Sequence, residues 1–277
     1  MEITTYYNYN DNIRTYEYYN EDKKLHREDG PAITYYFDDG NKYYEEYYIN
    51  GKLHREDGPA VIYYNEGKLL REKYYLNGKL NRKDGPAEIY YNAKEKPIHE
   101  KYYKDDMFHR EDGPAITYYY ESGEIEIESY HLNGKLHKED GPAFITYYKN
   151  GAIKKEIYHI NSNKHREDGP AYISYYENGK VEDEYYFIND EFHREDGPAT
   201  TVYDEQGTIQ LQFYYIKGKF IMNDCEVEKY INSKKPIRVR KIDKLKILYN
   251  VCKKRNLQDK VKELENKLLI STLQNRD

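Results

Sequence analysis

The sequence predicts a mainly β fold, an elongated array of antiparallel β-hairpins in a single sheet, built from 28-residue repeats and followed by a short α-helical C-terminal cap. Three observations predict it. The heptapeptide HREDGPA, or a near copy, occurs seven times at regular spacing. Two series of tyrosines keep the same period. The last part of the chain loses that period and shows helical spacing instead.

The Asp-Gly-Pro-Ala part of the motif sets the period. Its glycine recurs every 28 residues, with one step of 27, at Gly30, Gly58, Gly85, Gly113, Gly141, Gly169 and Gly197. The segments that follow read AITYY, AVIYY or AYISY, and such runs of β-branched and aromatic residues favour strands. Each repeat therefore begins with a strand.

Tyrosine marks two further positions of the repeat. The fifth residue after the motif proline is always tyrosine: Tyr36, Tyr64, Tyr91, Tyr119, Tyr147, Tyr175 and Tyr203. A second series runs Tyr19, Tyr47, Tyr74, Tyr102, Tyr130, Tyr158, Tyr186 and Tyr214. We expect each motif alanine to lie opposite the second-series tyrosine of its own repeat. A large ring then faces a small methyl group, and such cross-strand pairs contribute roughly 0.2–1 kcal/mol each.

This register places the hairpin turns. In five repeats the centre falls on an X-Gly pair, which predicts a two-residue type I′ turn: Asp39–Gly40, Ser122–Gly123, Asn150–Gly151, Asn178–Gly179 and Gln206–Gly207. The second and third copies centre on Gly67 and on Lys94–Glu95, where we expect looser loops. Residues 6–19, around Asp11–Asn12, predict an eighth, degenerate hairpin that begins the stack.

HREDGPA is expected to form the joint between hairpins. Asn50–Gly51 predicts another tight turn, and Leu53 an apolar anchor. Gly58 is expected to supply a backbone conformation closed to other residues, and Pro59 to start the next strand where no donor is required. The charged residues are expected to pair in a mixed-charge ladder along one edge. The joint residues include Asp57, Gly58, Pro59 and Ala60, and their counterparts Asp140, Gly141, Pro142 and Ala143.

Domain boundaries follow from where the signature is lost. We expect the array at residues 1–224, with a degenerate unit at 1–22 and seven repeats to about 220, and a helical tail at 225–277. Two sets of apolar residues in the tail have helical spacing: Ile242, Leu245, Leu248 and Cys252, and Leu257, Val261, Leu264 and Leu268. Two or three helices are expected to cover the last strand edge.

Composition favours a thin, intracellular fold. The hydrophobic content is 38%, and much of it is tyrosine, with 37 copies. Tyrosine carries a hydroxyl that needs a partner when it is buried, so a thick aliphatic core is not expected. No long apolar run or signal-peptide pattern is present, and two lone cysteines are typical of a reducing compartment. The sequence thus predicts a soluble intracellular protein with no transmembrane segment.

Charge is divided unevenly. Residues 234–277 carry 14 Lys and Arg against 5 Asp and Glu, a net +9, so the rest of the chain carries −15 of the total −6. The favoured interpretation is a helix face that docks against the acidic array. The alternative is contact with nucleic acid or an anionic membrane through Lys234, Lys235, Arg238, Arg240, Lys241, Lys244 and Lys246.

The repeats, of the form GPAxIxYYxNGxxxxxxYYxNGKLHRED, resemble MORN-type repeat proteins. They are most similar to the variant with YYxNG half-units and to proteins with HREDGPA signatures associated with giant viruses of amoebae. The likeness covers residues 20–220. It implies an elongated sheet of hairpins used as a scaffold, in the host cytoplasm or the virion, and it implies no catalytic residues.

The function expected from the sequence is a non-enzymatic scaffold for protein–protein interaction or assembly. No catalytic residue, cofactor or metal site is expected, and the protein partner stays unidentified. One alternative is lipid or nucleic-acid binding through the basic tail. A second is a metal-binding or hydrolytic site at the HRED motifs, because His54, Glu56 and Asp57 have the chemistry for it.

Overall fold

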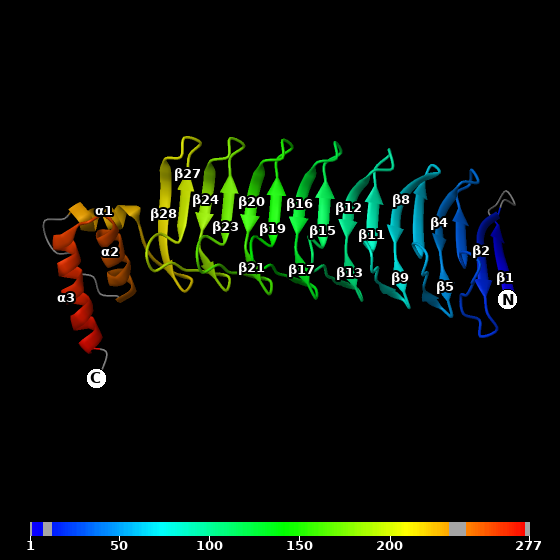
Figure 1. Ribbon diagram of the computed structural model, residues 1–277, viewed down its shortest axis with the longest axis horizontal. Helices are drawn as coiled ribbons and strands as arrows, with labels where there is room; N and C mark the ends of the chain where they lie inside the picture. The colour runs from blue at the N-terminus through cyan, green and yellow to red at the C-terminus, as the bar shows by residue number, and fades with distance from the viewer. Residues whose placement is uncertain (1, 8–12, 233–241, 275–277) are drawn as a thin grey trace. The chain divides into compact units, whose positions relative to one another are not determined.

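The computed structural model describes residues 2–7, 13–232 and 242–274. In these residues, seventeen strands belong to one antiparallel sheet of hairpins, six two-stranded ribbons accompany it, and a short helical part follows (Figure 1). The fold class predicted from the sequence is confirmed. By their contacts, the residues form two compact units, the first being 1–137 with 146–151 and the second 138–145 with 152–277.

The strands of the large sheet are β1 (Glu2–Tyr7), β2 (Ile13–Tyr19), β3 (Ile33–Tyr36), β4 (Lys42–Glu46), β7 (Val61–Asn65), β8 (Lys68–Lys73), β11 (Glu88–Tyr91), β12 (Pro97–Lys101), β15 (Ile116–Tyr119), β16 (Ile125–Ser129), β19 (Phe144–Tyr147), β20 (Ile153–Ile157), β23 (Tyr172–Tyr175), β24 (Val181–Tyr185), β27 (Thr200–Tyr203), β28 (Ile209–Ile216) and β29 (Lys219–Asn223). The ribbons are β5–β6 (Tyr48–Ile49, Lys52–Leu53), β9–β10 (Tyr75–Leu76, Lys79–Leu80), β13–β14 (Tyr103–Lys104, Met107–Phe108), β17–β18 (His131–Leu132, Lys135–Leu136), β21–β22 (His159–Ile160, Asn163–Lys164) and β25–β26 (Phe187–Ile188, Glu191–Phe192).

The predicted strand register is confirmed in both units. Ile33 pairs with Glu46 in the first unit, which sets Ala32 opposite Tyr47. Tyr172 pairs with Tyr185 in the second. All seven motif alanines have no exposed surface: Ala32, Ala60, Ala87, Ala115, Ala143, Ala171 and Ala199. The neighbouring rings therefore pack over the small alanine side chain.

The predicted turn type is wrong, although its position is right. The Phe37 N–H donates to the Asn41 carbonyl at 2.8 Å, which closes a three-residue loop, and only Gly40 has a positive φ, of 83°. The register shifts by one residue between Tyr35 and Tyr36 to admit the extra loop residue. A type I′ turn would also need Asp39 at positive φ, whereas a type I turn with a following bulge needs only the glycine there.

The loops expected to be looser are not. In the second copy Glu66 and Gly67 have φ of 50° and 75°, as a two-residue type I′ turn requires, so this hairpin is the tighter one. In the third copy Glu95, with φ 55°, takes the place of the glycine in the same three-residue loop. The Asn92 side-chain oxygen accepts from the Lys94 and Lys96 amides and holds that loop closed.

Strands β1 and β2 pair antiparallel, so the predicted N-terminal hairpin is confirmed, and its turn at Asp11–Asn12 lies outside the described residues. One series member needs correction. The Tyr18 N–H donates to the Ala32 carbonyl, as the Tyr47 N–H does to that of Ala60. Tyr18 rather than Tyr19 therefore begins the second series, because the turn that follows it is longer than in later repeats.

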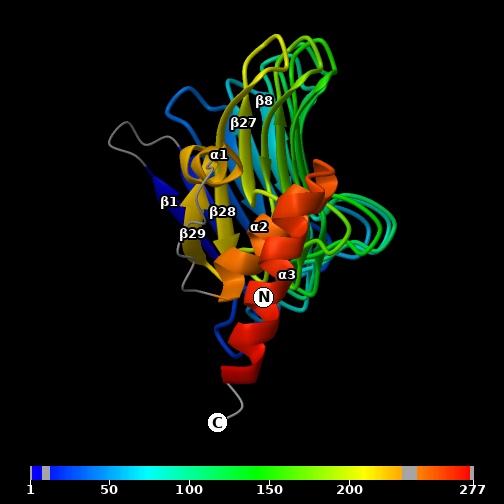
Figure 2. The same cartoon turned by 90° about the vertical axis from the view of Figure 1, so that its left-hand side faces the viewer.

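Among the described residues, three helices follow β29: α1 (Asp224–Asn232), α2 (Ile242–Lys254) and α3 (Gln258–Gln274). The Asn223 side chain caps the first by accepting from the Glu226 amide at 3.1 Å. Asn256, with φ 56°, ends the second in a Schellman motif. Helices α1 and α2 pack on β28 and β29, and α3 packs on α2 (Figure 2). An apolar core lies among them, as expected from the periodicity of the tail.

Within the described residues, no helix is both long and apolar enough to cross a membrane.

Candidate interaction surface

The arginine of HREDGPA covers a tyrosine ring. The Arg55 guanidinium lies 4.1 Å above the centre of the Tyr47 ring, its Nε donates to Asp57 at 2.9 Å, and its Nη1 donates to the Pro59 carbonyl at 3.3 Å. Five other joints repeat the cation–π contact at 3.8–4.1 Å, with the pairs Arg27–Tyr18, Arg82–Tyr74, Arg110–Tyr102, Arg166–Tyr158 and Arg194–Tyr186. The guanidinium thus replaces a second apolar layer.

The role predicted for Gly58 is wrong in its cause. Its φ lies outside the left-handed region, so no special backbone conformation is needed. A Cβ at this position would lie 3.0 Å from Arg55 Cζ. The guanidinium passes directly over the glycine, so a side chain at this position would force the guanidinium to shift.

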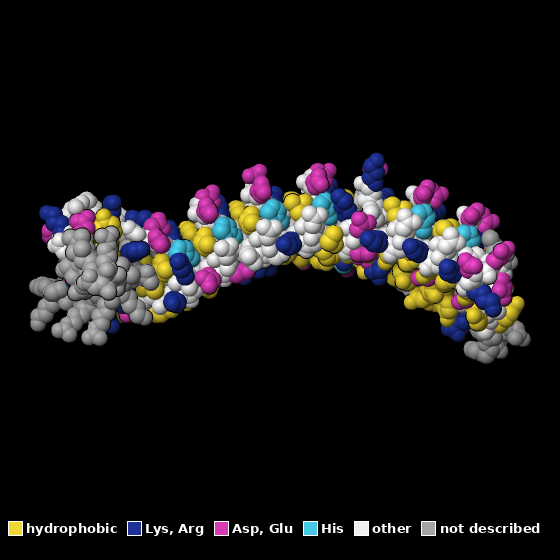
Figure 3. All heavy atoms as spheres, turned by 90° about the horizontal axis from the view of Figure 1, so that it is seen from below, with side chains coloured by type: hydrophobic (Ala, Val, Ile, Leu, Met, Phe, Trp, Pro, Cys, Tyr) yellow, Lys and Arg dark blue, Asp and Glu magenta, His cyan; other side chains and the backbone are white. Residues whose placement is uncertain are grey.

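The histidine of the signature fastens one repeat to the next. His54 Nδ1 accepts a hydrogen bond from the Asn77 amide at 3.1 Å, in the tight turn of the following repeat. The same bond is made by His26, His109 and His193, at 3.1–3.2 Å. His54 Nε2 lies 3.7 Å from the exposed Glu56 carboxylate. The acidic side chains stand out at the joints with histidines beside them, as Figure 3 shows.

The fifth joint departs from the others. It has Lys138 in place of the arginine, so a Cβ on Gly141 would find its nearest neighbour at 3.6 Å. The predicted need for a backbone conformation that favours glycine holds at Gly141 and also at Gly85, whose φ values are 143° and 148°. Asp140 is exposed and Pro142 is half-buried, while Ala143 is fully buried like its counterparts. The fifth joint thus keeps the buried alanine with a lysine in place of the guanidinium.

A tyrosine–glutamate ladder went unrecognised in the sequence. The Tyr64 hydroxyl donates to Glu45 at 2.8 Å, and five later first-series tyrosines repeat the bond at 2.7–2.9 Å: Tyr91–Glu72, Tyr119–Glu100, Tyr147–Glu128, Tyr175–Glu156 and Tyr203–Glu184. The sequence did contain a sign of this ladder. Each of these glutamates stands two residues before the second-series tyrosine of its own repeat, as Glu45 does before Tyr47. Burial, together with the bond to Glu184, raises the pKa of Tyr203 to about 12.

The opposite face of the sheet carries a row of rings in the first unit, which we call the aromatic row. Its members are directly opposite one another on successive strands from β3 to β15: Tyr35, Tyr44, Tyr63, Arg71, Tyr90, His99 and Tyr118. The Tyr35 and Tyr44 rings are stacked with centres 5.5 Å apart, and those of His99 and Tyr118 lie 4.4 Å apart. All seven side chains are half-buried, so their outer edges reach solvent.

The same row in the second unit has no ring. From β20 to β28 its members are Lys155, Ser174, Asp183, Val202 and Leu211. The joint and the tyrosine–glutamate ladder continue through these repeats unchanged, so the repeat does not need an aromatic residue at this position. The aromatic row is therefore a feature specific to the first unit.

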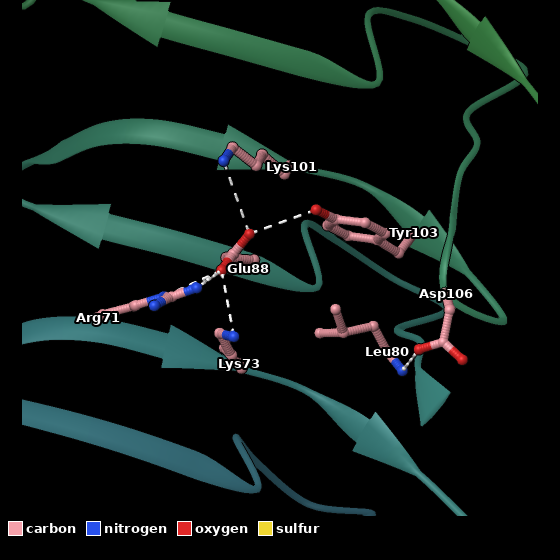
Figure 4. Close-up of polar contacts among 7 residues, drawn as sticks. All are labelled: Arg71, Lys73, Leu80, Glu88, Lys101, Tyr103 and Asp106. Atoms are coloured by element: carbon pink, nitrogen blue, oxygen red, sulfur yellow. Dashed lines mark hydrogen bonds and ion pairs between the residues drawn. The ribbon is translucent and has the colours of Figure 1, made fainter. Parts of the chain in front are cut away.

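A charged cluster formed by Arg71, Lys73, Glu88 and Lys101 adjoins the aromatic row and shares Arg71 with it (Figure 4). Glu88 occupies a position at which other copies have Ile33, Val61, Ile116, Phe144, Tyr172 and Thr200. Its side chain is only 5% exposed and accepts hydrogen bonds from Arg71 and, at 3.4 Å, from the Tyr103 hydroxyl. Both lysine ammonium groups lie 3.7 Å from its oxygens.

The cluster shifts the pKa values of its members. Burial alone would raise the pKa of Glu88, but the hydrogen bond and charge of Arg71, together with the charges of Lys101 and Lys73, hold that pKa below its ordinary value. Burial and the charge of Arg71 lower the pKa of Lys73 despite the neighbouring carboxylate. Three cations thus surround one anion, and the cluster keeps a net charge of +2.

The basic tail docks on the last joint where it is described. Lys254 Nζ lies 3.0 Å from Asp196, and the Asn250 side-chain amide donates to the Glu195 carbonyl at 2.7 Å. Lys244 pairs with Glu226 at 3.0 Å, and Lys246 is exposed. The other predicted polyanion contacts lie outside the described residues: Lys234, Lys235, Arg238, Arg240 and Lys241.

The described residues contain no group of three or more His, Cys, Asp or Glu side chains arranged to hold a metal ion. At the joint, His54 and Asp57 do not converge on a common point. The carboxylate of Asp57 is held by Arg55, and His54 faces the next repeat.

No family model and no curated protein matches the chain. Among solved structures, it is similar to alternansucrase in complex with isomaltononaose, with 17% identity and a TM-score of 0.19 over 79% of this chain. The match spans 16% of the alternansucrase chain.

Proposed function

We propose that the chain is a non-enzymatic repeat scaffold that binds a protein partner through the aromatic row of its first unit. The observation that carries the proposal is that the joint of the repeat makes internal contacts, while the row on the other face varies along the sheet. The polar groups of HREDGPA bond to their own or the next repeat in copy after copy. The row, in contrast, is aromatic only from β3 to β15 of the first unit, where it ends opposite Ile127, and its positions from β20 to β28 of the second unit are aliphatic and polar.

The chemistry of the row favours a protein partner. Tyrosine offers a large contact area with few rotatable bonds, and its hydroxyl forms hydrogen bonds at an interface. The rings already contact one another, as Tyr44 and Tyr63 do at 5.9 Å, so little side-chain freedom is lost on binding. The resemblance of the repeats to MORN-type proteins also supports a scaffold.

The experiment is affinity capture with the full chain, comparing two matched variants. Tyr63→Ala with Tyr118→Ala removes two rings of the aromatic row, while Ser174→Ala with Val202→Ala changes the same row positions in the second unit. We expect the first variant to lose roughly tenfold or more in affinity for a captured partner, and the second to bind as the wild type does. Circular dichroism checks that both variants fold.

Equal capture by the two variants would show that the aromatic row is not the contact surface. Capture that depends only on residues 234–277, and weakens with salt, would favour the nucleic-acid or membrane alternative.

A further inference from the structure

The charged cluster contains more positive charge than the buried carboxylate requires. One cation hydrogen-bonded to Glu88 would pair it, and Arg71 does so through two nitrogens. Lys73 and Lys101 lie on the strands to either side, each directly opposite Glu88. Removing an extra charge from water is unfavourable unless another interaction offsets the loss of hydration. The two lysines therefore need an explanation other than pairing with Glu88.

The geometry leaves both ammonium groups with hydrogens to donate. Each lies 3.7 Å from a Glu88 oxygen, beyond ordinary hydrogen-bond length. Their side chains are 20% and 17% exposed, so they are largely buried and still reach solvent in part. Figure 4 shows them approaching Glu88 from opposite sides. An oxyanion placed over Glu88 would be reached by both.

Aromatic rings flank this position. Lys101 Nζ lies 5.2 Å from the centre of the Tyr90 ring and 5.8 Å from that of Tyr118. Arg71 lies 4.5 Å from Tyr90 on the other side. A ligand that places an acidic group between the lysines would therefore also contact the aromatic row.

We propose that the charged cluster receives a carboxylate or phosphoryl group of an acidic peptide whose neighbouring side chains lie on the aromatic row. This inference rests on the proposed function, because it specifies the chemistry of the same protein partner. The excess within the cluster is +2, and because Lys73 also interacts with the charge of Glu46 on β4, this excess suits a single oxyanion. In the second unit, the corresponding row from β20 to β28 carries Ile157, Tyr172, Tyr185, Thr200 and Phe213, with no charge to attract such a group.

A peptide fits this surface better than single-stranded nucleic acid does. Nucleic-acid platforms offer free ring faces to bases, but here the rings contact one another, face to face in Tyr35–Tyr44 and tilted or edge-on in the pairs that follow. Residues 1–233 carry 30 Lys and Arg against 45 Asp and Glu, so the array as a whole repels a polyanion. A single local excess of positive charge favours a single acidic group.

The test uses the full chain, labelled with a fluorophore, on an array of random-sequence peptides that includes phosphoserine. We expect the bound peptides to be enriched in Asp, Glu or phosphoserine beside aromatic or aliphatic residues. Lys73→Met with Lys101→Met should weaken the binding of the acidic peptides roughly tenfold or more, while Arg71 still pairs Glu88. Lys155→Met, a half-buried lysine of the second unit, is the matched control and should change nothing.

The outcomes separate this inference from the scaffold function. If peptides bind but show no acidic preference, or keep it in the double lysine variant, the oxyanion site is overturned while the scaffold stands. If the wild type binds no peptide, the site is also overturned, and the capture experiment with the row variants still decides the scaffold. Binding of labelled oligouridine that is lost with the two lysines would replace the peptide with nucleic acid.

Discussion

Tyr186 and Tyr214 occupy the same position in successive repeats of the second unit, but different layers cover them. Tyr186 lies under the Arg194 guanidinium of the joint, at 3.9 Å. Tyr214 has no joint arginine after it, because the chain reads KGKFIMND there, and it is 2% exposed beneath the helices. A repeat inside the array is thus covered by its own joint, whereas the last one needs an apolar core.

The difference shows two ways of stabilising one sheet. Inside the array, rings are held by cations, carboxylates and fully buried alanines such as Ala171, so the sheet depends on ionisable and hydrogen-bonded groups. At the C-terminal end of the array, a conventional apolar core is formed by Met222, Leu248 and Leu264, whose exposed fractions are 0–1%. The stability of the array should therefore depend on pH, and the stability of the helical cap should depend on its buried apolar volume.

Alkaline pH should have the largest effect on stability, and it should destabilise the array. Bonding to Glu17 raises the pKa of Tyr19 to about 12, and burial raises that of Tyr203 to about 12, against about 10 for an unfolded tyrosine. A pKa raised by folding contributes stability that is complete below pH 10 and is lost as the pH rises toward 12. Titration followed by circular dichroism and tyrosinate absorbance should show strand structure and tyrosine protons lost together over that interval.

Tyrosinate formation completed near pH 10 with the strand signal intact would contradict this dependence. A control is the Tyr203→Phe variant. It removes one titrating group of the ladder and should make the loss of strand structure slightly less steep with pH.

A core substitution in the cap should come next. Leu248→Ala removes a side chain that is 1% exposed within α2, and truncation of this kind lowers the free energy of unfolding by about 2–5 kcal/mol. Chemical denaturation measures it. Lys246→Ala, on the exposed side of the same helix, is the matched control and should stay within about 0.5 kcal/mol. Equal effects of the two changes would mean that the helices do not form a packed layer.

The joint offers a sharper test of how the array is covered. Gly58→Ala places a methyl group 3.0 Å from Arg55 Cζ and should lower the free energy of unfolding by about 1–3 kcal/mol through overpacking. In an Arg55→Ala background the same change should cost much less, because the obstructing guanidinium is gone. A double-mutant cycle measures this coupling. Additive effects would show that Gly58 is needed for its backbone after all.

The sequence predicted the hairpins, their register and the helical tail because alanine, tyrosine and apolar spacings determine these locally. It did not predict the turn at Gly40, since a two-residue turn and a three-residue loop with a bulge share one register away from the turn. It could not distinguish a glycine needed for φ from one needed for space, as at Gly58.

The contacts between repeats were harder to predict. The Tyr64–Glu45 bond joins residues 19 positions apart in different repeats, so only the recurrence of the glutamate could have indicated it. The charged cluster is similar, because Glu88 departs from an apolar or hydroxyl-bearing position in the other copies. The cluster could not be recognised from the sequence, because Lys73 and Lys101 become neighbours of Glu88 only when the strands pair.

The smallest effect is expected where the array and the helices of the second unit meet through charge. Lys254→Met removes the 3.0 Å ion pair with Asp196, whose two side chains are 55% and 58% exposed. Exposed pairs contribute about 0–1 kcal/mol, so the free energy of unfolding should fall by no more than that, and less at high salt. Asp196 keeps its 2.8 Å bond to Arg194, so the joint stays closed. A loss as large as that expected for Leu248→Ala, measured by the same denaturation, would mean that charge rather than apolar packing holds the helices on the last strands.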